Sequence, residues 1–289
     1  MYPTLIDFGP IGIHSYGLML ATAFITVVFV LQYELKRRGF VAELAGSIVM
    51  AAAIGGIVGA KVYSALLDGA INIRELFSTA GLVAINIREL FSTAGLVWYG
   101  GLIGGCLAVT IVVVRSPNPY LPTIDIIGPT LLLGYGIGRI GCLLAGDGDY
   151  GPPSDLPWAM AFPNGTVPTD VPVHPTPIYE SLMSFAFFGL LWSQRRRFEG
   201  VPGTTFGLSL ILLGVERFIA EFWRITPRVL GWMTAAQIFS IVAFVVGIVL
   251  IFWLRGRPRA VAAAPSAEVA TPSTRDPSSP RRKRRQRKR

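Results

Sequence analysis

An arginine and two aspartates come directly after an apolar run of membrane length, within the stretch Gly134–Gly151, GYGIGRIGCLLAGDGDYG. An ionised side chain at membrane depth is costly unless it is paired, hydrated or holding a charged ligand. Arg139 therefore needs a partner. A purely structural explanation is that Arg139 pairs with Asp147 or Asp149, or that it snorkels to the lipid headgroups. We favour the functional interpretation, in which Arg139 helps to hold a charged ligand.

A second group of charges lies in GVERFIAEFWR, at the end of a later apolar run. Arg217 and Glu221 are four residues apart and Arg224 is seven from Arg217, so one helical face would carry all three. Two arginines against one glutamate leave a net positive charge, which predicts an anionic ligand. Guanidinium forks suit phosphate, and three arginines that include Arg139 predict a site for a phospholipid headgroup.

Polar side chains also stand near the ends of several other apolar runs. Each has a structural explanation, because a histidine can cap a helix, a lysine can snorkel, and glycines beside a tyrosine allow close helix packing. The residues are His14 and Tyr16 in HSYG, Lys61 in GGIVGAKVY, Tyr99 in WYGG, and Tyr179 and Glu180 in HPTPIYES. We expect these side chains at the outer end of the molecule, together with the arginines.

The composition is typical of a polytopic membrane protein. Hydrophobic residues make up 52% of the 289, charged residues 15%, and the mean hydropathy is +0.54. Several apolar runs approach the roughly 20 residues that a helix needs to cross the hydrocarbon. They are Ile11–Gln32, Leu44–Leu67, Leu96–Val114, Ile124–Ala145, Ile178–Trp192, Thr204–Phe222 and Ala235–Leu254. We expect an all-α protein with seven transmembrane helices, in which the short run Ile178–Trp192 borrows flanking residues.

Lysine and arginine indicate how the helices are oriented. No basic residue precedes Lys36. The later ones follow the first, third, fifth and seventh runs, at Lys36–Arg38, Arg115, Arg195–Arg197 and in the carboxyl-terminal tail. All would lie on one side of the membrane, which the positive-inside rule makes cytoplasmic. We therefore expect the amino end outside and the carboxyl end in the cytoplasm.

The net charge of +9 belongs mainly to an appendage. Arg281–Arg289, RRKRRQRKR, carries eight basic residues, and without them the net charge is +1, which argues against a nucleic-acid-binding function. A linker rich in Pro, Ala and Ser precedes this segment and is too poor in apolar residues to fold. We expect a membrane domain over residues 1–256 and a disordered basic tail over 257–289. The tail either contacts anionic lipids or is solvated without a specific role.

Two further features of the chain have simpler explanations. Cys106 and Cys142 lie inside predicted helices, so a structural disulfide or a cysteine metal site is not expected, and helix packing explains Cys106 best. The segment AINIRELFSTAGLV, residues 70–83, recurs unchanged at 84–97. It could form an amphipathic arm on the membrane surface. We favour an accidental duplication, since doubling a loop adds only about 0.6 kcal/mol of closure entropy.

Five motifs together resemble one family. HSYG at His14, YGG at Tyr99, GRIG around Arg139, HPxxIYE at His174 and RFxxExxR at Arg217 occur in the order found in prolipoprotein diacylglyceryl transferases. The resemblance covers about residues 10 to 240. It implies a seven-helix enzyme of the bacterial plasma (inner) membrane, without a metal or cofactor. Such an enzyme moves diacylglycerol from phosphatidylglycerol to the lipobox cysteine of a preprolipoprotein signal peptide and releases glycerol phosphate.

The resemblance also implies roles for residues of this chain. Arg139 and Arg217 would clamp the phosphate, Glu221 would orient Arg217, and Tyr16 would line the headgroup site. Asp147 stands nearest the family's acidic residue after GRIG, and Asp149 is the alternative because this loop is one residue longer. The other expected substrate-binding residues are Lys61, Gly151, Tyr179, Glu180 and Arg224.

The chain departs from the family pattern at three positions. Tyr99 stands where histidine is usual, Cys142 where asparagine is usual, and Pro177 where glutamine is more usual. Because tyrosine is a poor base at neutral pH, His14 is a second catalytic candidate for accepting the thiol proton, unless the position of Tyr99 holds no base at all. A paralogue with another acceptor, a non-catalytic lipid-binding protein and a transporter remain alternatives. The lack of paired inverted repeats disfavours the transporter.

Overall fold

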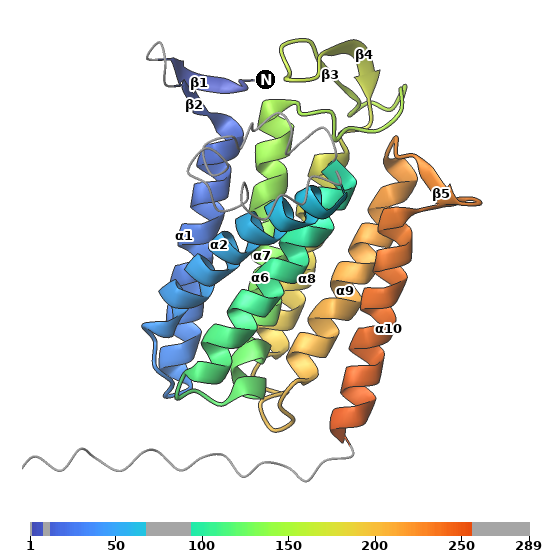
Figure 1. The fold of residues 1–289 in the computed structure, drawn as a ribbon. Helices are drawn as coiled ribbons and strands as arrows, with labels where there is room; N and C mark the ends of the chain where they lie inside the picture. Colours follow the sequence, from blue (N-terminus) through green and yellow to red (C-terminus); the bar gives the residue numbers. More distant parts are fainter. Residues whose placement is uncertain (1, 8–11, 68–93, 256–289) are drawn as a thin grey trace, which may run out of the picture.

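The computed structural model of the chain describes residues 2–7, 12–67 and 94–255. The duplicated stretch, apart from its last four residues, lies outside these described residues. So does the whole of the predicted basic tail. Helices dominate the described part and form a bundle, with short hairpins gathered at one end of it (Figure 1).

Seven long helices make up most of the described residues. They are α1 (Ser15–Arg37), α2 (Leu44–Leu67), α6 (Ala94–Arg115), α7 (Tyr120–Ala145), α8 (Thr176–Gln194), α9 (Thr204–Ala220) and α10 (Ala235–Arg255). Within the described part, α1, α2, α7 and α10 each contain a stretch long and apolar enough to cross a membrane. The expected count of seven helices agrees with this structure.

Three antiparallel two-stranded hairpins lie toward the upper end in Figure 1. Their strands are β1 (Thr4–Asp7) with β2 (Gly12–His14), β3 (Met160–Phe162) with β4 (Thr169–Val173), and β5 (Arg228–Leu230) with β6 (Met233–Thr234). The sequence analysis did not predict them, because strands of two to five residues leave no periodic pattern. They surround the end of the bundle at which the arginines meet.

The boundaries of two helices differ from those expected. The first helix begins at Ser15 and not at Ile11, because residues 12–14 pair with β1 as strand β2. Helix α7 begins at Tyr120, four residues before the predicted Ile124. Pro119 is its N-cap residue, and a proline fits there because the first N–H groups of a helix have no intrahelical acceptor.

The two helices that follow bear more directly on the site. Helix α8 extends the short apolar run at both ends, as expected, and so reaches 19 residues. Helix α9 ends at Ala220, and the chain continues as a single 3-10 turn, η1 (Glu221–Trp223). Arg224 follows in an extended conformation. The expectation that one continuous helical face carries Arg217, Glu221 and Arg224 is therefore wrong beyond Ala220.

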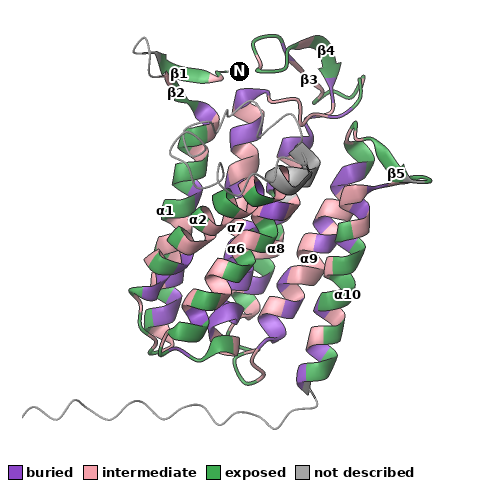
Figure 2. Ribbon diagram, in the orientation of Figure 1, coloured by how far each residue is buried: buried purple, intermediate pink, exposed green. Residues whose placement is uncertain are grey.

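The bundle exposes large apolar side chains on its outer faces. They include Leu18, Ile25 and Phe29 on α1, Ile103 and Leu107 on α6, and Val245, Val249 and Phe252 on α10. The exposed positions alternate with buried ones along the helices (Figure 2). Such surfaces fit helices whose surroundings are lipid. Cys106 is also exposed, so the expectation that it packs between helices is wrong.

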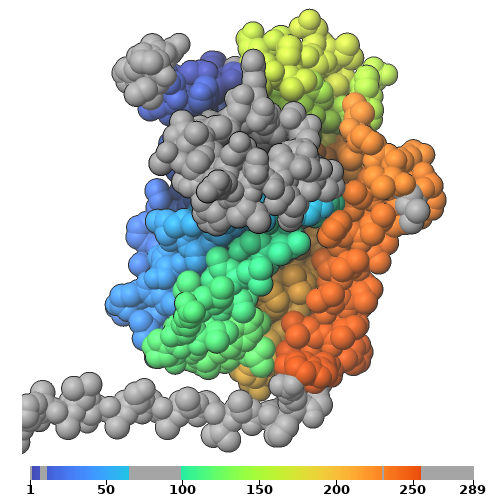
Figure 3. Space-filling view, in the orientation of Figure 1, coloured from blue at the N-terminus to red at the C-terminus, as the bar shows by residue number. Residues whose placement is uncertain are grey.

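Helices α2 and α6 pack against each other through glycine and form the front face in Figure 3. A Cβ atom at Gly59 would lie 2.8 Å from the Cα of Gly104 and closer still to the carbonyl oxygen of Gly100. A Cβ at Gly55 would likewise meet the backbone of Gly104. Without side chains at these positions the two backbones approach closely, which is a common means of helix association in membranes. The predicted small-residue seam is confirmed.

A buried glutamate joins several elements at the end of the bundle away from the hairpins. The Glu34 side chain is 1% exposed, and Arg37 donates from Nε to its Oε2 at 2.8 Å. Arg38 Nε lies 3.2 Å from Oε1, and Arg195, which follows α8, donates to Oε2 at 3.2 Å. Glu199, between α8 and α9, also pairs with Arg37. The segment between α8 and α9 is therefore tied to the end of α1.

A second carboxylate at this end caps α9 from another helix. Asp125 on α7 is 2% exposed, and its two oxygens accept the backbone N–H groups of Gly203 at 2.5 Å and Phe206 at 2.8 Å. These are N–H groups at the start of α9, which has no side-chain cap of its own. Asp125 thus fixes α9 against α7, and α9 leads to the arginine site at its other end.

The glycine seam generates the first prediction. Gly59→Ala should lower the free energy of unfolding by about 1–3 kcal/mol, because the methyl group overlaps the backbone of α6. Gly46→Ala on the same helix is the control, since a Cβ there meets no atom within 4 Å. Thermal unfolding of both variants in detergent measures the difference. Equal stabilities would contradict the close packing.

Candidate functional site

Glu180 is the central residue of the arginine site. It lies in α8, its side chain is 0% exposed, and Arg139 Nε of α7 is 2.8 Å from its Oε2. Its Oε1 accepts a hydrogen bond from Arg217 Nη1 of α9 at 3.0 Å, and Arg224 Nη1 is 3.5 Å away. The Tyr135 hydroxyl donates to the same oxygen at 3.3 Å. One buried carboxylate therefore gathers the three arginines, from elements far apart in the sequence.

A second carboxylate bridges two of these arginines from the loop after α7. One oxygen of Asp149 pairs with Arg139 Nη1 and the other with Arg224 Nη2. Burial tends to raise the pKa of Asp149, but the charges of Arg139 and Arg224 outweigh it and lower the pKa to about 2. Asp149 is therefore ionised at neutral pH.

The loop that carries Asp149 turns sharply after α7. Gly146, with φ 57°, ends the helix, and Gly148, with φ 93°, follows in the same left-handed region. The Asp149 N–H donates to Asp147 Oδ1 at 3.2 Å, which holds the loop over the arginines. Burial and then the neighbouring charge of Asp149 raise the pKa of Asp147. The two aspartates that the sequence left as alternatives are therefore in different electrostatic states.

Glu221 completes the set of carboxylates. Its Oε2 lies 3.0 Å from Arg217 Nη2 and 3.9 Å from Arg224 Nε, and its side chain is 0% exposed. Glu180, Asp149 and Glu221 thus pair with the three arginines, charge for charge. The surplus of positive charge expected from the sequence is absent among these described residues. The motif around Arg217 contains only one carboxylate, Glu221, and Glu180 and Asp149 provide the other two negative charges from elsewhere in the chain.

Gly151 brings the loop after α7 against the 3-10 turn η1. Its N–H donates to the His174 carbonyl oxygen at 2.9 Å. A Cβ there would lie 2.9 Å from the His174 Cβ and closer still to the Trp223 carbonyl oxygen. That same oxygen accepts a hydrogen bond from Thr176 Oγ1 at 2.8 Å. Gly151 was predicted to bind substrate, and the structure shows it at a close backbone crossing beside Arg224.

An aromatic cluster borders the site on the side of β4 and α8. The Tyr179 hydroxyl accepts a hydrogen bond from Trp158 Nε1 at 2.7 Å and lies 3.3 Å from His174 Nδ1. The Trp223 ring meets the Tyr179 ring edge-on, with centroids 5.9 Å apart. Tyr179 is therefore next to the site through Trp223, and its hydroxyl points into the aromatic cluster.

Tyr16 is close to the arginine site, whereas His14 lies apart from it. A Cβ at Gly141 would lie 3.3 Å from the Tyr16 ring. The Tyr16 hydroxyl is close enough to Arg139 for an electrostatic interaction with its charge. His14 is exposed in strand β2, with its Nδ1 3.4 Å from Thr4 Oγ1. In the described part of the chain, His14 therefore belongs to the hairpin of β1 and β2.

Tyr99 and Lys61 approach from the α2 and α6 side. The Tyr99 ring stacks on Phe239 of α10 at a centroid distance of 3.8 Å. The Tyr99 hydroxyl is close enough to Arg217 and Glu221 for electrostatic interactions with their charges. The Lys61 Nζ is buried and has no hydrogen-bond partner among the residues that the structure describes. Tyr99 is thus at the site, while no contact in the described residues joins Lys61 to the arginines.

Tyr135 and Glu216 are site residues that the sequence analysis missed. Tyr135 stands four residues before Arg139, and its ring lies under that guanidinium at 4.9 Å. Glu216 is 1% exposed and accepts a hydrogen bond from Ser184 Oγ at 2.7 Å. Glu216 could have been found from the sequence as an acidic residue inside an apolar run, but only its neighbour Arg217 was interpreted as a site residue.

Cys142 faces the same guanidinium. Its Sγ lies 3.7 Å from Arg139 Nη1. Ligand atoms of Cys142, Asp147 and Asp149 lie within 4.8 Å of one another. The cation that Cys142 and Asp149 contact in the structure is the guanidinium of Arg139, so we assign no metal to this group.

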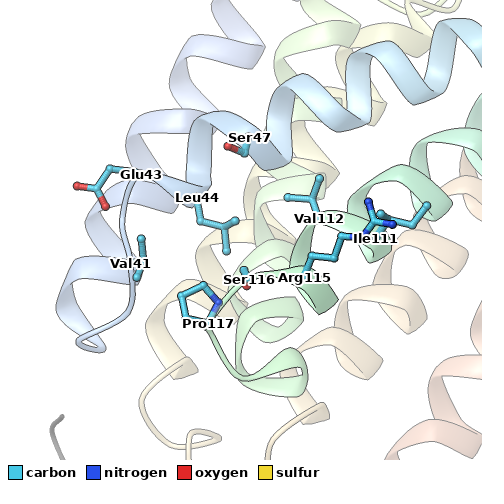
Figure 4. A pocket seen from close by; sticks show the side chains of 9 residues that line it. All are labelled: Val41, Glu43, Leu44, Ser47, Ile111, Val112, Arg115, Ser116 and Pro117. Carbon is cyan, nitrogen blue, oxygen red and sulfur yellow. The ribbon is translucent and has the colours of Figure 1, made fainter.

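A surface hollow at the other end of α2 and α6 is not part of this site. Glu43, Ser47, Arg115 and Ser116 are among its lining residues (Figure 4). Arg115 ends α6, whereas Tyr99 lies near the start of that helix. The hollow and the arginine site are therefore at opposite ends of the bundle.

Fold and site together define a multi-pass helical membrane protein with a buried arginine and carboxylate cluster at one end. Residues 3–253 match the family Prolipoprotein diacylglyceryl transferase. A relative from Clostridium tetani is 32% identical over 254 residues, covering 86% of this chain and 96% of its own. One from Trichormus variabilis is 31% identical over 272 residues (89% and 91%), and one from Pseudomonas aeruginosa is 30% identical over 266 residues (89% and 95%).

Each of these relatives is named phosphatidylglycerol–prolipoprotein diacylglyceryl transferase. The chain belongs to the prolipoprotein diacylglyceryl transferase family, and it is an enzyme of the transferase class.

The central position of Glu180 generates the second prediction. Glu180→Gln removes a buried negative charge from three arginines, and we expect it to lower the free energy of unfolding by about 3–5 kcal/mol. Glu216→Gln is the matched control, because Glu216 is equally buried and its hydrogen bond from Ser184 can be made to an amide oxygen. It should lower the free energy of unfolding by less than about 1 kcal/mol. Thermal unfolding in detergent compares the two, and similar losses would rule out Glu180 as the central partner.

Proposed function

We propose that this site transfers the diacylglyceryl group of phosphatidylglycerol to the lipobox cysteine of a preprolipoprotein. The observation that carries the proposal is the meeting of Arg139, Arg217 and Arg224 around buried Glu180, with Asp149 bridging two of them. Arginine forks at the end of a membrane bundle suit the phosphate of a lipid headgroup. The names of the relatives specify the same donor and the same class of acceptor.

The reaction is a displacement at the glyceryl carbon. The cysteine thiolate forms a C–S bond, the C–O bond to phosphate breaks, and glycerol phosphate leaves with the electron pair. Arg139 and Arg217 stabilise the charge that develops on the departing phosphate. Glu221 holds Arg217 in position through the 3.0 Å ion pair. Tyr16, beside Arg139, lines the headgroup site.

The acceptor thiol must also lose a proton, since its ordinary pKa is about 8.5. We assign this proton to Asp147. Burial and the charge of Asp149 raise the pKa of Asp147, which makes its carboxylate a better base than an ordinary aspartate. His14 is exposed on the outer hairpin, and tyrosine is a weak base at neutral pH. Tyr99 then contributes through its position beside Arg217 and Glu221.

The arrangement of basic residues supports an orientation. Arg37, Arg38 and Arg195 surround Glu34 at the end of the bundle away from the site. By the positive-inside rule this end is cytoplasmic, so the arginine site and the hairpins face the outside of the bacterial plasma membrane. Prolipoproteins would meet the site there after their signal peptides have entered the membrane.

With this orientation, the basic tail, residues 257–289, would lie on the cytoplasmic side of the membrane. It follows α10, whose last residue, Arg255, lies at the same end as the Glu34 cluster (Figure 1). A tail on the cytoplasmic side would contact anionic lipid headgroups, each basic residue near the surface contributing about 1 kcal/mol. We propose this contact as an addition to the membrane domain, which carries the chemistry.

The third prediction tests the reaction itself. Purified protein incubated with phosphatidylglycerol and a lipobox peptide should give a thioether-linked lipid peptide, detected by mass. Arg139→Ala and Glu221→Ala should each lower the rate by roughly 100-fold or more, because both remove stabilisation of the leaving phosphate. Tyr99→Phe should have a milder effect. If the intact protein gives no product under conditions in which another transferase of the family does, the acceptor is different or the protein only binds lipid.

The fourth prediction concerns Asp147 and pH. A base must be ionised, so a raised pKa moves the loss of activity on acidification to a higher pH than an ordinary aspartate, with pKa about 3.9, would give. Asp147→Asn should lower kcat and remove this acid limb from the pH profile. A profile measured with Asp147→Asn that keeps the limb unchanged would assign the proton to another group.

A further inference from the structure

Asp149 is the most exposed of the three carboxylates that pair with the arginines. Its side chain is 30% exposed, compared with 13% for Arg139, 13% for Arg224 and 0% for both Glu180 and Glu221. It therefore covers Arg139 and Arg224 from the solvent side.

The way in which Asp149 binds resembles the binding of a phosphate. Its two oxygens bridge two guanidinium groups, one nitrogen from each arginine. A phosphate group offers two oxygens to two guanidinium groups in the same way. Carboxylate and phosphate would therefore compete for the same N–H donors.

The balance of charges among the arginines and carboxylates also indicates that Asp149 and a phosphate exclude each other. With Asp149 in place, the three arginines are matched by Asp149, Glu180 and Glu221, so the site offers no unmatched positive charge among its described residues. A phosphate added to this arrangement would leave an excess negative charge in a buried place, which is unfavourable. If Asp149 moves away, the phosphate restores the balance.

The three carboxylates differ in their freedom to move. Glu180 lies within α8 and Glu221 in the turn that ends α9, and both are fully buried. Asp149 lies in a loop beyond α7, shortly after Gly146 and Gly148, which adopt left-handed backbone conformations. Of these three carboxylates, Asp149 is the one that can leave without disturbing a helix.

We propose that Asp149 is a placeholder for the phosphate of the lipid donor. Its carboxylate occupies Arg139 and Arg224 while the site is empty, leaves them when the phosphate binds, and returns when glycerol phosphate is released. No covalent bond changes in this exchange. The identity of the anion rests on the proposed function, whereas the exchange itself concerns any phosphate ester that reaches the two arginines.

The fifth prediction is that removing the placeholder tightens binding. Asp149→Asn keeps the size of the side chain but removes the negative charge that bridges Arg139 Nη1 and Arg224 Nη2. An apparent Kd equals the intrinsic Kd divided by the fraction of protein in which the site can bind, so a larger fraction gives a lower apparent Kd. We expect the Kd of phosphatidylglycerol, titrated into the full chain in dodecyl maltoside, to fall roughly tenfold. Asp155→Asn is the control, since Asp155 is an exposed aspartate of the same outer segment. Its Kd should be unchanged.

A parallel titration with glycerol 1-phosphate separates the lipid from the phosphate. Tighter binding of both ligands to Asp149→Asn supports the exchange, and tighter binding of phosphatidylglycerol alone supports it for a lipid-borne phosphate. If neither ligand binds more tightly to a folded Asp149→Asn protein, or if binding weakens, Asp149 holds the arginines in place and the proposal is wrong. Because this readout needs no turnover, a failed transfer assay with tighter binding would reject the proposed function and leave the exchange standing.

Chemical labelling of the unmutated protein gives a second test. A water-soluble carbodiimide activates protonated carboxyl groups, and the two arginines hold the pKa of Asp149 at about 2 against the effect of burial. When phosphatidylglycerol displaces Asp149, labelling with glycine ethyl ester should rise at this residue, as measured by mass spectrometry of peptides. Unchanged or lower labelling at a lipid concentration that saturates binding would overturn the proposal.

Discussion

The buried arginines of this protein need partners of the opposite sign, and this constraint explains most of the architecture of the arginine site. Arg139, Arg217 and Arg224 lie at the end of a bundle whose outer faces are apolar. In such surroundings an unpaired guanidinium would be displaced toward water, or its neighbours would rearrange. Glu180 provides a negatively charged partner for all three arginines. Glu180 thereby ties α7, α8 and α9 together at this end of the bundle.

The same constraint shapes the chemistry of the site. A site built only from arginines would bind phosphate tightly and release it slowly. A site whose arginines are already neutralised binds an anion by exchange, so the binding of substrate and the release of product are closer in free energy. The cluster also excludes other cations from the donor atoms of Cys142 and Asp149, because the guanidinium of Arg139 is already there. Under the proposed function, ion pairing thus serves the folded state and the reaction together.

The sequence predicted the charged members of the site better than their connections. Arg139, Arg217, Glu221 and Arg224 are conspicuous because charges are rare in apolar runs. Glu180 was recognised as a polar group near the start of a helix, but its partners come from α7 and α9, and no local pattern shows a contact across 37 or 41 residues. The seven apolar runs were sufficient to predict the helices. The 3-10 turn after α9 was not predictable, because its contact with the Gly151 loop at Trp223 joins segments about 70 residues apart and leaves no local pattern.

Helix α8 joins two ionic layers on opposite sides of the molecule. Glu180 stands near its beginning and gathers three arginines, while Arg195, directly after its last residue, binds Glu34 at the other end. Nineteen residues at about 1.5 Å each give a rod of roughly 28 Å, close to the thickness of the hydrocarbon layer. A shift of the rod by one residue would break the ion pairs at both ends. The stretch from Glu180 to Arg195 therefore acts as a ruler that sets the separation between the two ionic layers.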